Sequence, residues 1–123
     1  MKRIEAIVRS EKMQDVKQGL VDSGHAELTL YHVQCHSNEK GIIHRWRGHE
    51  DTVDLLPEVA VVLMVNDQEV PAIVEVIRQN AQTNRIGDGK IFVTSVEQVI
   101  SMRSGEMDTD GPWPGGMAHV PMP

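Results

Sequence analysis

The sequence predicts an α+β fold with the ferredoxin-like order β-α-β-β-α-β, in which two helices cover one face of an antiparallel sheet. Two stretches carry apolar residues at helical spacing, and each lies between segments in which apolar residues alternate or run unbroken, as they do in strands. The chain has 123 residues, of which 40% are apolar, and this is the size of one domain with a modest core.

The first half of this unit is predicted from two strands, at residues 2–8 and about 27–35, in which apolar residues alternate. Gly24 precedes the second strand and is typical of the position just past the end of a helix. The helix between the strands buries an apolar stripe formed by Met13, Val16 and Leu20.

The second half begins with an unbroken apolar strand, which indicates that both faces of this strand are covered. Asn66 or Asp67 caps the following helix, and Pro71 lies in its first turn, where the missing N–H costs little. Its apolar stripe is formed by Val70, Ile73, Val74 and Ile77. The strands of this half are predicted at residues 59–65, 90–96 and 99–103, the last of them a short fifth strand.

Two segments show no periodicity. Residues 37–56 are predicted to be a loop, and a loop of this length in a compact domain is more often functional than merely connecting. Residues 104–123 contain four prolines and four glycines and are predicted to be a mobile tail. The folded domain is therefore expected to span residues 1–103.

Composition excludes several classes of function. A formal charge of −6 argues against nucleic-acid binding, which requires clustered basic residues. The longest apolar run, residues 59–65, is too short to span a bilayer, and no leader is expected at the N-terminus, so we predict a cytoplasmic protein without membrane insertion. The single cysteine, Cys35, agrees with a reducing compartment. No catalytic constellation and no motif for a redox cofactor stands out.

The segment Thr83–Phe92 contains the strongest functional motif, a turn in which glycines flank Asp88 and a lysine opens an apolar strand. Gly87 and Gly89 allow positive φ and let backbone N–H groups approach a ligand, and Lys90 adds a compact cation. This arrangement is suited to a phosphate, although hairpin turns use the same residues.

Together with this turn, further segments make the first hundred or so residues resemble the P-II family of trimeric signal-transduction proteins, as a divergent member. The resemblance implies a ferredoxin-like homotrimer that binds ATP or ADP in clefts between subunits and contacts targets through a long T-loop. It implies a regulator and not an enzyme. The segments that carry the resemblance are Met1–Arg9, Thr29, Trp46-Arg47-Gly48, Val53–Pro57, Thr83–Phe92 and Arg103–Glu106.

The resemblance also assigns roles to individual residues. Ile7 and Thr29 would line the adenosine pocket, and Arg103 would come from an adjoining subunit. The target, a membrane transporter such as an ammonium channel or a metabolic enzyme of nitrogen assimilation, would contact Arg45, Trp46 and Arg47. The ribose and phosphates would be held by Gly87, Asp88, Gly89 and Lys90.

This chain departs from the family pattern where other members carry positive charge. The loop base reads Asn38-Glu39, Glu58 replaces a basic residue, and Ser101 replaces an arginine. In the family, Mg²⁺ and 2-oxoglutarate bind at the loop base beside the ATP phosphates. A like charge at about 4 Å costs on the order of 4 kcal/mol at an effective dielectric of about 20. We therefore predict weak or absent 2-oxoglutarate binding, a possible Mg²⁺, and a preference for ADP or AMP over MgATP.

Covalent regulation through the loop is not expected, because Asp51 occupies the position of the tyrosine that some members have uridylylated. Other functions stay open. One alternative is a regulator of a transporter that responds to a metal, since imidazole and thiolate suit transition metals. The same kind of regulator could instead respond to a small anion such as bicarbonate. A slow nucleotide hydrolase is a third possibility. The candidate metal ligands are Cys35, His36, His44 and His49.

Overall fold

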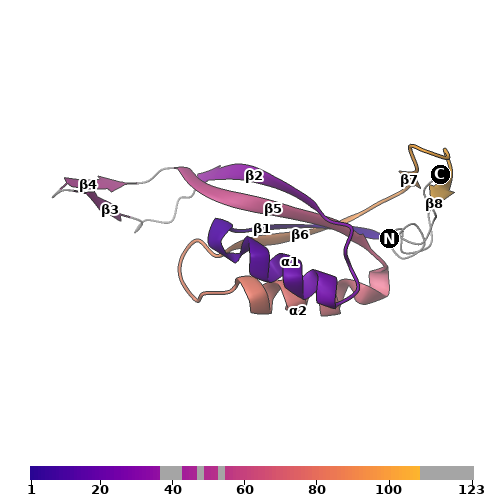
Figure 1. Cartoon of the computed structure of the whole chain (residues 1–123), viewed down its shortest axis with the longest axis horizontal. Coiled ribbons are helices and arrows are strands. Elements are labelled where there is room, and N and C mark those ends of the chain that lie inside the picture. Colours follow the sequence, from indigo (N-terminus) through magenta and orange to yellow (C-terminus); the bar gives the residue numbers. More distant parts are fainter. Residues whose placement is uncertain (37–42, 47–48, 53–54, 109–123) are drawn as a thin grey trace.

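The computed structural model describes residues 1–36, 43–46, 49–52 and 55–108, and it confirms the ferredoxin-like α+β fold. Two helices, α1 (Met13–Asp22) and α2 (Val70–Ala81), lie side by side against one face of the main sheet (Figure 1). This sheet is antiparallel, and its strand order is β2-β5-β1-β6. Its strands are β1 (Lys2–Arg9), β2 (Thr29–His36), β5 (Leu55–Val65) and β6 (Gly89–Ser95).

The core lies between the sheet and the helices. Period-two alternation places every second residue of β1 on the helix-facing side, and these residues are paired in register with buried residues of β5. The apolar stripes predicted for both helices form the helix side of the core, and their residues Val16, Leu20, Ile73 and Ile77 are at most 3% exposed. The sheet side of the core consists of Ile4, Ala6, Val8, Val59, Val61, Leu63 and Val65.

The helix boundaries follow from local chemistry. Short helical turns, η1 (Ser10–Lys12) and η2 (Asp67–Glu69), precede α1 and α2. The backbone N–H of Asn66 donates to the Glu69 carboxylate at 3.2 Å, which satisfies one free donor before α2 begins. After α1, Gly24 has a φ of +91°, as predicted for the residue that ends this helix.

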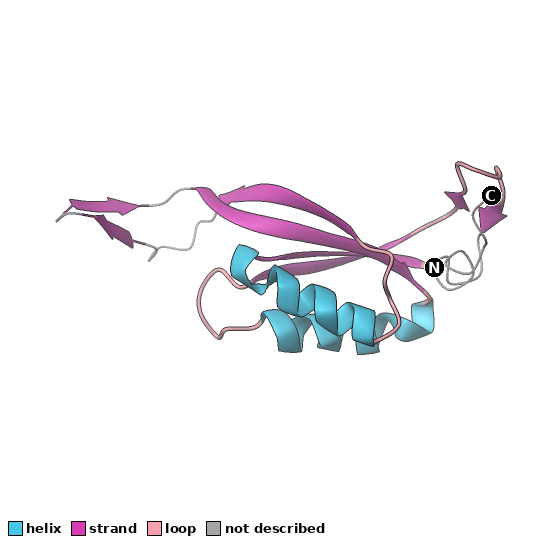
Figure 2. Cartoon of the chain, viewed as in Figure 1, coloured by secondary structure: helices cyan, strands magenta, loops and turns pink. Residues whose placement is uncertain are grey.

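Among the residues that the structure describes, no helix lies on the second face of the main sheet (Figure 2). We call it the open face. Tyr31 and Phe92 lie on it and are 41% and 49% exposed. Ala60 and Val62 share this face in the central strand β5, yet they are 0% and 7% exposed because neighbouring strands flank them. The prediction that the apolar run in β5 is covered on both faces is therefore met on the helix side only, since no layer among the described residues packs on the open face.

The segment predicted as a loop at residues 37–56 contains more regular structure than its polar pattern indicated. β3 (Ile43–Trp46) and β4 (His49–Thr52) pair with each other as a separate antiparallel hairpin beyond the ends of β2 and β5 (Figure 1). Moreover, β5 begins at Leu55 and not at residue 59. Pro57 is tolerated there because β1 ends at Arg9, so that β5 has only β2 as a neighbour at this point.

The predicted fifth strand is shorter and lies elsewhere. β7 (Val99–Ile100) does not join the main sheet but pairs with β8 (Met107–Asp108), inside the segment predicted as a tail. Gly105 has a φ of +73° and closes this hairpin, with its N–H donating to the Ser101 carbonyl at 2.8 Å. Sequence periodicity missed β8 because a strand of two residues has no period. Among the residues described, neither helix has the length and apolar character to cross a bilayer.

Candidate functional site

Residues 83–89, which we call the glycine turn, connect α2 to β6 at the end of the sheet where β2 ends and β5 begins (Figure 1). Gly87 and Gly89 have φ values of +95° and +107°, which side-chain-bearing residues rarely adopt. A Cβ on Gly89 would lie 1.7 Å from the carbonyl oxygen of Ile7. Glycine is therefore required at position 89 both by backbone conformation and by the close approach of β1.

Asp88 organises this turn from inside. Its Oδ2 accepts hydrogen bonds from the backbone N–H groups of Thr83 at 2.8 Å and Asn84 at 2.9 Å. Its Oδ1 accepts from the Thr83 hydroxyl and, at 3.1 Å, from Nε of Arg9. The same arginine donates through Nη2 to the Ile86 carbonyl. The carboxylate thus joins both ends of the turn to the end of β1.

These contacts stabilise the ionised carboxylate. Partial burial on its own raises the pKa of Asp88, but the hydrogen bonds from the Thr83 hydroxyl and amide, the Arg9 guanidinium and the Asn84 amide outweigh burial and hold the pKa at about 2. Asp88 is therefore a charged structural centre at any physiological pH. Because its oxygens are occupied by groups of the protein, its role in the turn is to shape the backbone.

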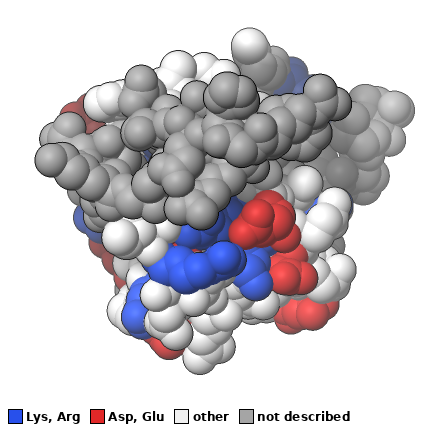
Figure 3. Space-filling view, turned by 90° about the vertical axis from the view of Figure 1, so that its left-hand side faces the viewer, with Lys and Arg blue, Asp and Glu red and all other residues white. Residues whose placement is uncertain are grey.

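A hollow of about 860 Å³ adjoins the turn on the open face, within the size range of small-molecule sites. It brings together five of the residues predicted for the nucleotide site: Ile7, Gly87, Asp88, Gly89 and Lys90. Figure 3 looks onto this end of the molecule, where Lys and Arg side chains gather directly beside Asp and Glu side chains. The other residues that line the hollow are Cys35, His36, Leu56, Glu58, Arg85, Ile86 and Phe92.

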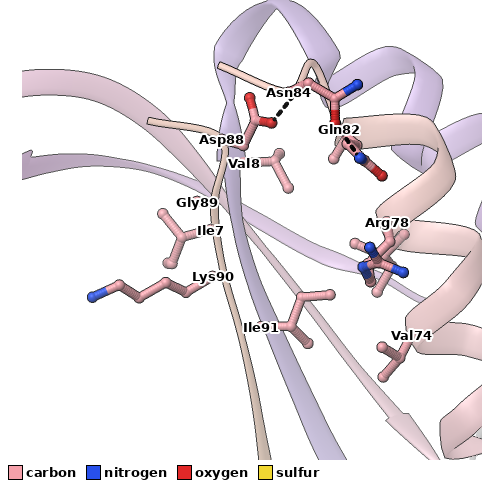
Figure 4. Close-up of a pocket in the computed structure, with 12 residues that line it drawn as sticks. Ile7, Val8, Val74, Arg78, Gln82, Asn84, Asp88, Gly89, Lys90 and Ile91 are labelled. Carbon is pink, nitrogen blue, oxygen red and sulfur yellow. Dashed lines mark hydrogen bonds between the residues drawn. The ribbon is translucent and has the colours of Figure 1, made fainter. Parts of the chain in front are cut away.

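A second, smaller groove of about 460 Å³ lies on the helix side of β6 and shares part of the turn with the hollow. Figure 4 shows Ile7 and Lys90 on one side of the strands, while Ile91 lies on the other side and faces Val74 and Arg78 of α2. The cationic end of Lys90 points away from the helices. Ile7 and Lys90 line both spaces, but their side chains lie on the side of the open-face hollow.

Glu58 and Cys35 line the end of this hollow that lies next to the predicted loop. Glu58 is 6% exposed, and its nearest register partners are Arg9 in β1 and Val33 in β2. Burial raises the pKa of the Cys35 thiol, the hydrogen bond and charge of Glu58 raise it further, and the charge of Lys90 lowers it less. Cys35 thus keeps its proton at neutral pH, which disfavours roles that need a thiolate.

Two predicted site residues lie apart from the hollow. Thr29 begins β2, which is the opposite edge strand from β6 and is separated from it by β5 and β1. Arg103 lies between β7 and β8, at the far end of the molecule from the turn (Figure 1). Within one chain, neither residue can reach the position of Lys90.

Other predicted residues lie outside the described structure. Asn38, Glu39 and Arg47 fall in segments that are not described. For the target-contact and metal candidates in β3 and β4, only the backbone is described; these are His44, Arg45, Trp46 and His49. Over the described part of the chain, no three His, Cys, Asp or Glu side chains gather as a metal site would require.

Sequence reasoning missed Arg9, which holds the turn, and also Leu56, Arg85, Ile86 and Phe92, which line the hollow. A signal was present, because Arg9 follows Ile7 by two residues in the first strand and therefore shares its face. Pairing with an aspartate 79 positions away could not be read from spacing.

Residues 1–106 match the family described as Nitrogen regulatory protein P-II. A protein of this name from Rhizobium meliloti (strain 1021) is 44% identical over 110 residues, which are 89% of this chain and 98% of the relative. Another from Nostoc punctiforme is 43% identical over 110 residues, with the same coverage of 89% and 98%. Nitrogen regulatory protein P-II 2 of Methanothermobacter thermautotrophicus is 42% identical over 106 residues, covering 86% and 92%.

The fold and the turn define a ferredoxin-like α+β domain with a glycine-rich site at the end of an open sheet face. Since the match covers most of this chain and nearly all of each relative, the chain belongs to the nitrogen regulatory protein P-II family. The resemblance inferred from the sequence is thereby confirmed.

Proposed function

We propose that this protein is a homotrimeric regulator of nitrogen metabolism that binds adenine nucleotides in clefts between subunits and acts on a transporter or enzyme through residues 37–56. The nitrogen role is supported by relatives named nitrogen regulatory proteins. Names of this kind describe regulators, which favours a binding function over catalysis.

The observation that carries the proposal is the glycine turn. Two glycines with positive φ present their backbone to the open-face hollow, and Lys90 extends into the same hollow. Backbone N–H groups beside a flexible ammonium suit phosphate oxygens, since both are donors and neither adds bulk. Apolar contacts from Ile7 and Phe92 at the same hollow suit a purine ring.

An intersubunit position for the nucleotide follows from the two residues that lie apart. If Thr29 and Arg103 contribute to the site, they must come from another chain. Within the chain that supplies Lys90, Thr29 lies at the opposite edge of the sheet and Arg103 at the far end of the fold. The open face favours such an assembly, since Tyr31 and Phe92 are about half exposed on it. A second copy that covers this face would bury apolar surface, and such burial stabilises an assembly by about 25 cal/mol for each Å².

Signalling would arise from the strands that lead into residues 37–56. β2 ends at His36 and β5 begins at Leu55, and the hollow is lined by both of these strand ends. A ligand in the hollow therefore touches the base of this segment. A nucleotide that binds one arrangement of the segment more tightly shifts the population towards it, and a target selects that arrangement.

Titration calorimetry tests the proposal with ATP, ADP and AMP. We expect one nucleotide per protomer, and we expect Lys90→Ala to weaken the binding of each by tenfold or more, on the scale of a lost charged hydrogen bond of roughly 1.5–3 kcal/mol. Lys17→Ala is the matched control, because Lys17 is an exposed lysine on α1 away from the turn. Wild-type protein that binds none of the three nucleotides at millimolar concentration would contradict the proposal, and steady turnover of ATP lost in Lys90→Ala would favour a hydrolase instead.

A further inference from the structure

Arg9 contacts the glycine turn at two points. Its Nε donates to Oδ1 of Asp88 at 3.1 Å, and its Nη2 donates to the carbonyl of Ile86. The arginine side chain is 20% exposed and the aspartate side chain 25%, so water competes only partly for this pair. A planar guanidinium can make both contacts at once, which a single ammonium cannot do.

This arginine completes the set of donors around Asp88. The two backbone N–H groups and the hydroxyl of the turn come from its first residues, Thr83 and Asn84. Only Arg9 reaches the carboxylate from outside the turn, among the residues described, and it is part of a strand paired on both sides. The turn is thereby attached to the rigid sheet and not only to itself.

We propose that Arg9 is a positioning residue, which holds residues 83–89 in the ligand-binding conformation before any ligand arrives and acts on affinity through Asp88. The inference rests on the proposed nucleotide function and adds a residue to it. Without the guanidinium, the carboxylate and the Ile86 carbonyl lose their partner, and the turn populates other conformations. Affinity then falls in proportion to the binding-competent fraction.

The alternative is that Arg9 binds a phosphate directly, since it shares the open face with Ile7. The two roles differ in the ligand-free protein. A positioning residue changes the turn when no nucleotide is present, whereas a phosphate contact does not. They also differ in coupling, because a residue that acts mainly through Asp88 has a much smaller effect once Asp88 is altered.

Hydrogen exchange of the nucleotide-free trimer is the first measurement. The amides of Thr83 and Asn84, which donate to Asp88, are expected to exchange about tenfold faster in Arg9→Gln. Arg3→Gln is the matched control. Arg3 lies in the same strand and on the same face, and it pairs with Glu5 at 2.8 Å, far from the turn. Unchanged exchange of both amides in Arg9→Gln overturns the proposal.

Nucleotide affinity is the second measurement, with ADP as the probe. Arg9→Gln is expected to weaken ADP about tenfold and Arg9→Lys by less, because lysine restores the charge but only one contact. The double variant Arg9→Gln/Asp88→Asn is expected to lose clearly less affinity than the product of the two single losses, because the contact between the two side chains is lost only once and only the contact to the Ile86 carbonyl is lost in addition. Losses that multiply in the double variant overturn the proposal in favour of direct phosphate contact.

The two measurements separate failure of this inference from failure of the proposed function. If the wild type binds no ADP, the nucleotide function fails, and the exchange rates still decide whether Arg9 orders the turn. Melting temperatures of all variants show whether the fold is intact. Should Arg9→Gln not fold, both measurements are made on Arg9→Lys. The amides of Thr83 and Asn84 are then expected to exchange faster than in the wild type, by a smaller factor than about tenfold. Unchanged exchange of both amides would contradict the proposal.

Discussion

Gly89 sits where the turn meets the sheet, and its missing side chain is what lets β6 pass the Ile7 carbonyl. We expect Gly89→Ala to lose nucleotide binding and to destabilise the protein by more than the roughly 1–2 kcal/mol of an unfavourable backbone conformation, because the added Cβ would lie 1.7 Å from that oxygen. Gly24→Ala is the control, since Gly24 also has positive φ but open space around its Cα. Equal urea midpoints for the two variants would contradict this account.

Asp88 gives a prediction in pH. Its pKa is held at about 2 in the folded protein, below the ordinary 3.8, so the ionised form is favoured by folding. A depressed pKa contributes stability that is fully present above about pH 4 and is lost as the pH falls through about 2. Asp88→Asn should therefore cost on the order of 2 kcal/mol at neutral pH and little at pH 2. Urea unfolding at several pH values measures this, and a pH-independent difference would show that hydrogen-bond geometry, not charge, is what Asp88 contributes.

Glu58 gives a prediction about effector choice. The buried Glu58 side chain and Lys90 both line the hollow, and the resemblance to the family implies a basic residue at position 58 in members that bind 2-oxoglutarate. We predict little 2-oxoglutarate uptake by the wild type in the presence of MgATP, and stronger uptake by Glu58→Lys, because the substitution replaces repulsion with attraction. Tight uptake by the wild type in calorimetry would refute the charge argument.

At the scale of elements, the contact between the helices depends on Gly19. A Cβ on Gly19 would lie 2.5 Å from Nδ2 of Asn80, which donates to the Val76 carbonyl at 2.8 Å. Gly19→Ala should gain about 1 kcal/mol of helix propensity and lose a similar amount by displacing the amide, for a net change near zero. In the Asn80→Ala background the same substitution should stabilise the protein, as thermal unfolding would show. An equal effect in both backgrounds would exclude the clash.

Most helices and strands were predictable from sequence, because the spacing of apolar residues along the chain matches the residues that are buried. Val16, Leu20, Ile73 and Ile77 stand at helical spacing and all are buried. The hairpin of β3 and β4 was not predictable in this way, since in the part of the chain that the structure describes it pairs only with itself and packs against no helix or further strand that would impose an apolar face. The hairpin of β7 and β8 was not predicted for a related reason, because it depends on a turn around Gly105 and its strands show no periodic pattern.

For the molecule as a whole, the sequence predicted five of the residues that line the hollow as nucleotide contacts, but not how they are held. Gly87, Gly89 and Lys90 are local in sequence and were found from the motif. Arg9 was missed because its partner lies 79 residues away and only strand pairing brings them together. Thr29 and Arg103 were assigned by resemblance, and one chain alone places them away from the hollow. If both residues belong to the proposed site, a second chain must supply them.

We propose that each nucleotide lies between two chains, with Lys90 from one chain and Arg103 from the next. The most direct test of this intersubunit site is ADP binding by trimers mixed from two defective variants, Lys90→Ala and Arg103→Ala. Each variant alone should bind ADP weakly, and subunit exchange between them should restore high-affinity sites wherever an intact Lys90 meets an intact Arg103. Mixed trimers that bind no better than either parent would contradict the account.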